Sequence, residues 1–306
     1  MNSAYTHLIY KAFRKMAAMA AMVAVMLMTL AGCSGGDGDS GKTLAVSVEP
    51  QRAILQEIVG DRYQVVTLLA NGANPESFDP TMQTRKDAER AAAFFTTGGM
   101  PFEETLAKAL PEDVRIVDTG KGIEGVYGTH GHHHHHEGDH HDHDGDNGER
   151  DPHIWASVRN GRIIARNMLD AMVELDPDGA DVYRANYRRL DQRLDSLDKA
   201  LALKLQGGDR AFAVWHPSLS YFARDYGLEQ LPVGFENKEV SPRQLAQVAQ
   251  QAADHGVRVF FFQKEYDSRQ AQVLNDQMGT RLVTIKPLDA DWEGQLTQVA
   301  DELARK

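Results

Sequence analysis

One histidine of the chain lies where the surrounding residues would hold it in place. His153 belongs to the sequence DPHIW, in which Pro152 restricts the backbone before it. Ile154 and Trp155 follow it and are apolar enough to anchor the segment in a core. A single histidine is more often a surface or core residue than a ligand. This context nevertheless predicts an ordered imidazole that could bind a metal ion.

Two further segments carry side chains of the right type directly after predicted strands. His216 follows the expected strand 211–214, in the sequence WHPSLSYF. Glu76 and Asp79 lie in the turn-rich sequence GANPESFDP, which follows the expected strand 63–69. Strand ends are where ligand sites form in α/β proteins. Either acidic residue is a candidate ligand, although such a segment on its own is also typical of an ordinary surface loop.

A third feature is a histidine-rich insertion at residues 128–150, which contains almost no apolar residue and predicts a disordered loop. Imidazole suits zinc, copper and nickel. Because a flexible loop cannot fix a tetrahedral geometry, we expect weak, rapidly exchanging binding that scavenges or senses metal. The alternative, an affinity tag, is disfavoured because the run is internal and flanked by acidic residues. Its nine histidines are His130, His132, His133, His134, His135, His136, His140, His141 and His143.

The N-terminus carries the signature of export. Lys11, Arg14 and Lys15 precede the apolar run 16–30, and the sequence Leu-Ala-Gly leads to Cys33. The run is shorter than the roughly 20 residues that span a bilayer. The pattern is similar to a bacterial lipoprotein signal, in which the cysteine is lipidated. It predicts a protein that is lipid-anchored and extracytoplasmic, whereas an uncleaved anchor helix is the alternative.

Composition and missing motifs exclude several functions. Cys33 is the only cysteine, so an internal disulfide, a thiolate metal site and a cysteine nucleophile are all impossible. The formal charge of −11 argues against nucleic acid as a partner. The sequence has no HExxH motif, no Gly-x-Ser-x-Gly elbow and no Walker A motif. We therefore predict that the chain is not an enzyme and hydrolyses no ATP.

Apolar patterns predict two series of alternating strands and helices, which favour parallel sheets covered by helices. The first series comprises strands at 43–48, 63–69, 93–97 and 115–117 and helices at 50–59, 85–92 and 102–110. The second comprises strands at 211–214, 257–262 and 281–285 and helices at 218–226, 241–253, 268–278 and 292–305. Between them, leucines recur at three- and four-residue steps through 181–205, which predicts one long helix.

The predicted fold class is therefore α/β: two (β/α) lobes with parallel sheets, joined by one long rigid helix, with a ligand site in the cleft between the lobes. The expected boundaries are a signal peptide at 1–33, a Gly/Ser/Asp-rich tether at 34–42, an N-terminal lobe at 43–180 that includes the loop 128–150, a linking helix at 181–206 and a C-terminal lobe at 207–306.

Taken in order, these segments resemble the metal-binding solute-binding proteins of zinc and manganese ABC importers. The resemblance covers nearly the whole mature chain. It rests on the cysteine motif, the histidine-rich loop and four sequences: GANPESFDP, DPHIW, WHPSLSYFARDYGL and IKPLDADW. Members of that family have two (β/α) lobes bridged by a rigid helix, and they hold the metal between the lobes. The implied fold agrees with the one predicted from the patterns above.

The resemblance also implies a ligand set. His153 and His216 match the second and third ligands of the family. The chain departs from the pattern at the first ligand, where zinc members usually have histidine and this sequence has Glu76. The fourth ligand, when present, is an acidic residue near the end of the chain, and we favour Asp289. Other candidates for the fourth position are Asp291, Glu265 and a water molecule.

The resemblance implies a monomer that captures Zn²⁺ and passes it to a membrane permease, whose ATPase is a separate subunit. Two imidazoles and two carboxylates suit zinc, but the carboxylates also move the site toward Mn²⁺. The histidine-rich loop favours zinc again. A manganese importer subunit is therefore the main alternative. A zinc store or metallochaperone and a zinc hydrolase are less favoured.

Overall fold

The computed structural model describes residues 42–70, 72–127, 150–234, 241–264, 266 and 268–305. Contacts divide the chain into Met1–Ser40 and Gly41–Lys306, and every described residue lies in the second unit. Cys33, the nine clustered histidines and Glu265 lie outside the described residues. Within the described ranges, no helix combines the length and the apolar character that crossing a membrane requires.

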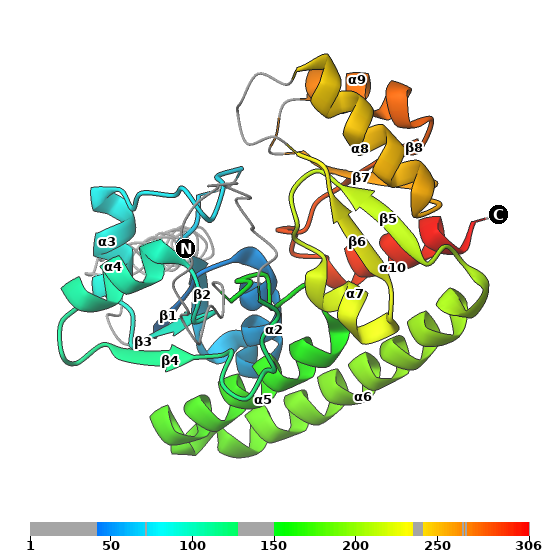
Figure 1. Ribbon diagram of the computed structural model, residues 1–306. Coiled ribbons are helices and arrows are strands. Elements are labelled where there is room, and N and C mark those ends of the chain that lie inside the picture. Colours follow the sequence, from blue (N-terminus) through cyan, green and yellow to red (C-terminus); the bar gives the residue numbers. More distant parts are fainter. Residues whose placement is uncertain are drawn as a thin grey trace, which may run out of the picture. The chain divides into compact units, whose positions relative to one another are not determined.

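The N-terminal lobe is built on a four-stranded parallel sheet in the order β2-β1-β3-β4. Its strands are β1 (Thr43–Val46), β2 (Gln64–Thr67), β3 (Ala93–Thr96) and β4 (Arg115–Asp118). The helices that connect them are α2 (Glu49–Val59), α3 (Met82–Glu89) and α4 (Pro101–Ala109). Figure 1 shows this lobe in blue to green.

The C-terminal lobe repeats the same topology, with a parallel sheet in the order β6-β5-β7-β8. Its strands are β5 (Ala211–Val214), β6 (Glu229–Pro232), β7 (Val259–Gln263) and β8 (Arg281–Ile285). Its helices are α7 (Ser220–Tyr226), α8 (Pro242–Asp254), α9 (Ser268–Met278) and α10 (Trp292–Ala304). In each sheet the first and third strands are neighbours, and ligands of such sheets bind beyond the carboxyl ends of the strands at that point.

The chain leaves the N-terminal lobe through α5 (Val158–Leu175) and crosses to the C-terminal lobe along the 25-residue α6 (Ala180–Lys204). Helix α6 packs against α2 and α5 and also against α10, so it contacts both lobes (Figure 1). Leu190, Leu194 and Leu201 on its inner face are buried. The predicted architecture of two α/β lobes joined by one long helix is confirmed.

The central strands are mostly apolar, because helices cover both faces of a parallel sheet. Phe94 and Phe95 of β3 and Phe260 and Phe261 of β7 are all fully buried. Successive side chains point to opposite faces, so Phe261 joins a core shared with α5 and α6, whereas Phe260 joins a smaller core under α8 and α9.

Two elements differ from the sequence prediction by more than two residues at an end. Helix α3 begins and ends three residues earlier than expected, because the Thr81 hydroxyl caps it by accepting a hydrogen bond from the Thr84 amide. The edge strand β6 was not predicted at all. It has four residues and ends at Pro232, and such a short strand with proline gives almost no apolar alternation.

Polar and aromatic contacts fix the lobes against each other through these helices. Arg193 of α6 pairs with Glu57 of α2 at 2.7 Å and with Glu293 of α10 at 2.8 Å. Gly161 of α5 lies against the ring of Trp292 of α10, where an added Cβ would come within 2.5 Å of the ring. The packing of α10 on α5 therefore requires glycine at position 161.

Replacing Gly161 with alanine should destabilise the protein by about 1 kcal/mol. Overpacking a core costs about 1–3 kcal/mol, and the better helix propensity of alanine returns up to about 1 kcal/mol. Urea unfolding would measure the change. Gly207→Ala is the control, since a Cβ there meets no atom within 4 Å. An unchanged or increased free energy of unfolding for Gly161→Ala would show that the contact between α5 and α10 can accommodate an added methyl group.

Candidate metal site

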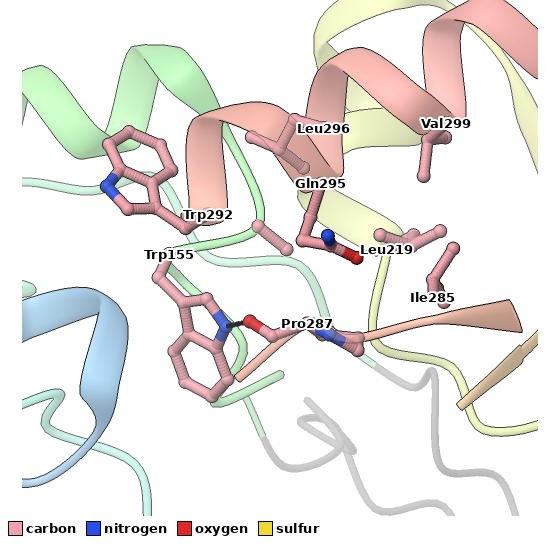
Figure 2. Close-up of a pocket in the computed structure, with 9 residues that line it drawn as sticks. Trp155, Leu219, Ile285, Pro287, Trp292, Gln295, Leu296 and Val299 are labelled. Carbon is pink, nitrogen blue, oxygen red and sulfur yellow. Dashed lines mark hydrogen bonds between the residues drawn. The ribbon is translucent and has the colours of Figure 1, made fainter. Parts of the chain in front are cut away.

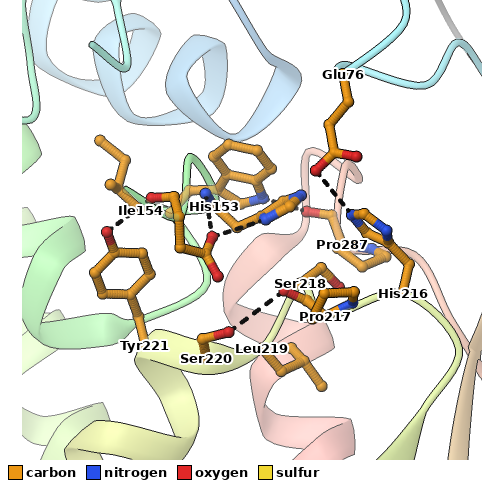
Figure 3. Close-up of polar contacts among 12 residues, drawn as sticks. Glu76, His153, Ile154, His216, Pro217, Ser218, Leu219, Ser220, Tyr221 and Pro287 are labelled. Atoms are coloured by element: carbon orange, nitrogen blue, oxygen red, sulfur yellow. Dashed lines mark hydrogen bonds and ion pairs between the residues drawn. The ribbon is translucent and has the colours of Figure 1, made fainter. Parts of the chain in front are cut away.

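Three loops bring together the side chains of Glu76, His153 and His216. Glu76 lies in the loop that follows β2, His153 lies in the segment before α5, and His216 follows β5. One ligand atom from each side chain lies within 4.8 Å of the other two. Figure 3 shows Glu76 approaching from one side and the two imidazoles from the other. The structure thus brings together three of the four predicted ligands.

The spacing of these atoms is close to that of a metal site. His216 Nε2 lies 3.2 Å from Glu76 Oε1, and the two imidazole rings are 5.1 Å apart between centroids. Ligand atoms placed tetrahedrally at about 2.1 Å from zinc are about 3.4 Å from each other. The pair formed by Glu76 and His216 already has that separation. The His153 ligand atom lies within 4.8 Å of the other two, so it would have to move inward by at most about 1.4 Å to reach that separation.

The exposure of the three side chains differs. His153 and His216 are 3% and 8% exposed, whereas Glu76 is 29% exposed. The two imidazoles are therefore held in the protein interior, where polar groups need defined partners. The carboxylate forms the outer side of the group, from which a cation could enter.

Asp151 fixes the orientation of His153. Its Oδ1 accepts a hydrogen bond from the His153 backbone amide at 2.8 Å and lies 2.8 Å from His153 Nδ1. Its own backbone carbonyl accepts a hydrogen bond from the Tyr221 hydroxyl at 2.8 Å. Because an ionised carboxylate can only accept, the proton of the imidazole lies on Nδ1. Nε2 is then the nitrogen that would bind a cation, as in the carboxylate–histidine–metal arrangement.

Asp151 is ionised at neutral pH although it is buried. Burial alone would raise the pKa of this carboxyl, but the charge of a protonated His153 and hydrogen bonds from His153 and Ser220 outweigh it. They hold the pKa at about 2, compared with 3.8 for an unperturbed group. Folding thus lowers the pKa of Asp151, so the ionised carboxylate stabilises the folded state. This contribution to the free energy of unfolding is fully present above pH 3.8 and is lost as the pH falls through about 2.

Gln263, the last residue of β7, forms hydrogen bonds with both the backbone amide and the backbone carbonyl of His216. Its Nε2 donates to the His216 carbonyl at 2.5 Å and to the Ser218 hydroxyl at 2.8 Å. Its Oε1 accepts from the His216 amide at 3.2 Å. Gln263 is 2% exposed, so these bonds are shielded from water. The neighbouring strand of the sheet therefore positions the loop that carries His216.

The loop that carries Glu76 is connected to the C-terminal lobe through Asn74. The Asn74 side-chain oxygen accepts a hydrogen bond from the Glu76 amide at 2.9 Å, and its nitrogen donates to the Tyr266 hydroxyl at 3.3 Å. The Tyr266 ring stacks on His216 with 5.5 Å between centroids. Tyr266 thus contacts a candidate ligand of its own lobe and the loop that holds a ligand of the other.

Trp155 closes the inner side of the group. Its ring meets His153 edge to face at 5.3 Å, and its Nε1 donates to the Pro287 carbonyl at 2.8 Å (Figure 2). Behind it lie apolar side chains of α10, including Trp292, Leu296 and Val299. Ile154 and Trp155 are each 1% exposed, so the sequence prediction that they anchor this segment is confirmed. The floor of the site is apolar and tightly packed.

The structure does not bring Asp289 into the group. Its Oδ1 accepts a hydrogen bond from the Asp291 amide at 3.0 Å, and its own amide donates to the Lys286 carbonyl, so this turn holds it elsewhere. Asp291 caps α10 by accepting from the Gly294 amide at 3.1 Å. Asp79 is exposed and is also absent from the group.

Asp151 and Gln263 were not predicted as site residues from the sequence. Asp151 had a local signal, since a carboxylate two residues before a candidate ligand histidine is well placed to bond its imidazole. Gln263 had none, because its contact with His216 arises only when β7 pairs with β5 in the sheet.

Asp151→Asn should weaken zinc binding by about 10- to 100-fold, because loss of the carboxylate removes the charge that orients His153 and raises its basicity. Competition titration with a zinc-binding dye would measure this change. Asp170→Asn is the matched control, since Asp170 forms an exposed pair with Arg166 on α5. Equal zinc affinity in Asp151→Asn and in the control would contradict the role given to Asp151.

The chain is similar to known proteins of zinc uptake. The high-affinity zinc uptake system protein ZnuA of Bacillus subtilis (strain 168) is 25% identical over 248 residues, which cover 78% of this chain and 76% of that protein. A crystal structure of ZnuA superimposes with a TM-score of 0.75 at 28% identity, covering 86% of this chain and 98% of that one. A ZnuA deletion mutant with zinc bound gives a TM-score of 0.74 at 29% identity, with coverage of 86% and 97%.

A family model also matches most of the chain. The family model described as zinc-uptake complex component A, periplasmic, matches residues 44–305, which include both lobes and all three clustered side chains. The chain therefore belongs to the family of periplasmic zinc-uptake complex component A.

Proposed function

We propose that this protein binds Zn²⁺ outside the cytoplasm through Glu76, His153 and His216 and delivers it to an ABC-type importer. The observation that carries the proposal is the convergence of these three side chains, two of them buried imidazoles, from loops of both lobes. Family membership supports the same function, since the family is defined by a periplasmic component of zinc uptake. Solute-binding components of this kind transport metal and are not enzymes.

The donor set favours zinc over harder cations. Two imidazole nitrogens and one carboxylate are common zinc ligands, and zinc tolerates low coordination numbers better than manganese does. Glu76 is the one feature that favours manganese, because it supplies oxygen where zinc members of the family usually have histidine. At a mixed site the Irving–Williams order still gives zinc the higher affinity.

The charge of the site has a further consequence. Two neutral imidazoles and one carboxylate leave a bound dication with one uncompensated positive charge. Three protein ligands also leave a tetrahedral zinc with one open position. In this proposal a water molecule or an anion occupies the fourth position, because the turn that holds Asp289 keeps it out of the described group.

The other parts of the proposal rest on the sequence. Cys33 would carry the lipid that holds the protein at the outer side of a membrane, through the tether at 34–42. The histidines of 128–150 would collect metal and pass it to the cleft. The protein would act as a monomer and dock on a permease with a separate ATPase. The domain boundaries remain those proposed above, with lobes at 43–180 and 207–306.

Replacing His153 or His216 with alanine should each lower zinc affinity by on the order of 100-fold or more, since loss of a ligand exceeds the 10- to 100-fold effect of an outer-shell residue. Glu76→Gln should also weaken binding. Isothermal titration calorimetry would measure each variant, with residues 129–146 deleted so that the clustered histidines do not contribute.

His255→Ala is the control for these variants. His255 is a half-exposed histidine of the C-terminal lobe that pairs with Glu229 at 2.8 Å, away from the candidate site. It should bind zinc as tightly as the unmodified protein. Wild-type affinity in either His153→Ala or His216→Ala would refute the proposed ligand set.

Deleting residues 129–146 distinguishes an importer subunit from a zinc store. An importer subunit should retain one tight zinc per chain, because the cleft ligands remain, whereas a store should lose nearly all bound metal. Elemental analysis of the deleted protein, purified without added metal, would measure both zinc and manganese. Finding one manganese and no zinc in the deleted protein would support the alternative cargo.

A further inference from the structure

A second cavity lies beside the candidate metal site, and two lysines and two carboxylates are among the residues that line it. Its volume is about 870 Å³, within the range of small-molecule sites. Leu288 lines both this cavity and the space around His153 and His216. Leu69, Ala70 and Gly72 of the N-terminal lobe form one wall, and Lys264 and Lys286 of the C-terminal lobe lie on the other. The cavity therefore lies in the same cleft as the cation site.

The sheet places these two lysines side by side. Gln263 of β7 and Ile285 of β8 form the last pair of the parallel ladder, and each lysine is the next residue along its strand. Neighbouring strands are about 4.8 Å apart, so two ammonium groups emerge from adjacent strand ends. Like charges at directly adjacent positions repel one another. Strand ends of this kind are also the usual ligand position in α/β sheets.

Two carboxylates, those of Glu49 and Asp289, line the cavity together with these lysines. Neither Lys264 nor Lys286 forms an ion pair within 4.0 Å of a described acidic group, although Asp289 lines the same cavity. Glu49 on the opposite wall is already paired with Arg52 at 2.5 Å and accepts a hydrogen bond from Thr67 at 2.6 Å. Both lysine side chains are exposed to the cavity and keep their donors for a ligand.

We infer that this cavity binds a small oxyanion with at least two negative charges, a polycarboxylate or phosphate, through Lys264 and Lys286. This inference deepens the proposed function and rests on it for the cation: the anion would offset the remaining positive charge of the bound dication and reach its open coordination position. Two lysines beside a cation site otherwise oppose cation binding, because like charges repel. The lysines and the cation then share one anionic partner.

Equilibrium dialysis of labelled citrate, and separately of labelled inorganic phosphate, against the zinc-loaded protein at a buffered free zinc concentration tests this inference. We expect the protein to bind about one citrate or one phosphate per chain. Whichever anion it binds shows whether the site accepts a polycarboxylate or phosphate. The double variant Lys264→Gln/Lys286→Gln should bind that anion at least 10-fold more weakly. The control Lys108→Gln/Lys199→Gln has the same net charge but alters exposed helical lysines, and it should bind like the wild type.

Zinc titrations of the same proteins separate this inference from the proposed function. Without a chelating anion, the double variant should bind zinc as tightly as the wild type or more tightly, because two repelling charges are gone. With the retained anion present, it should bind zinc more weakly than the wild type. The anion site is wrong if the wild-type protein binds neither citrate nor phosphate, or if the double variant binds the anion as well as the wild type does. Either result overturns it even when zinc binding is intact. If the unmodified protein does not bind zinc, the proposed function itself is wrong.

Discussion

Two separately built lobes can share one cation only if the distance between them is fixed. The candidate ligands occupy three loops, and none of these loops belongs to the same strand–helix unit as another. An error of an ångström between the lobes would separate Glu76 from His216, which now lie 3.2 Å apart. The long helix α6, the double pairing of Arg193 and the hydrogen bond from Trp155 to Pro287 all serve this one constraint.

Within each lobe, hydrogen bonds from buried polar residues then reduce the freedom of the ligands. Asp151 selects the tautomer of His153, and Gln263 holds the backbone of His216 from the neighbouring strand. Neither residue would contact the cation. A buried side chain with all its hydrogen bonds made has few alternative rotamers, so the imidazoles are preorganised before metal arrives. The imidazoles therefore lose their conformational entropy during folding, and binding of a cation does not have to order them.

The sequence was sufficient for those parts of the molecule that depend on local pattern. Strands β5 and β8 and helix α9 have the predicted ends, because apolar runs and flanking glycines mark them. His153 and His216 were identified from neighbours within two residues. What depends on pairing between distant segments could not be predicted: β6 exists only as an added edge of a sheet, and Gln263 reaches His216 only across that sheet. The described group does not include Asp289, whose carboxylate accepts a hydrogen bond from the Asp291 amide, a contact that the sequence pattern does not reveal.

The fixed distance between the lobes also limits how a cation could enter and leave the site. A hinge between the lobes would have to break the pairs of Arg193, separate Trp292 from Gly161 and break the bond between Trp155 and Pro287 together. Glu76 is different, because it is the most exposed ligand and its loop reaches the other lobe through the bond from Asn74 to Tyr266. Moving that loop alone would open the coordination sphere while both imidazoles stayed in place. We therefore expect local displacement of the Glu76 loop, with the lobes nearly fixed, to control exchange of the metal.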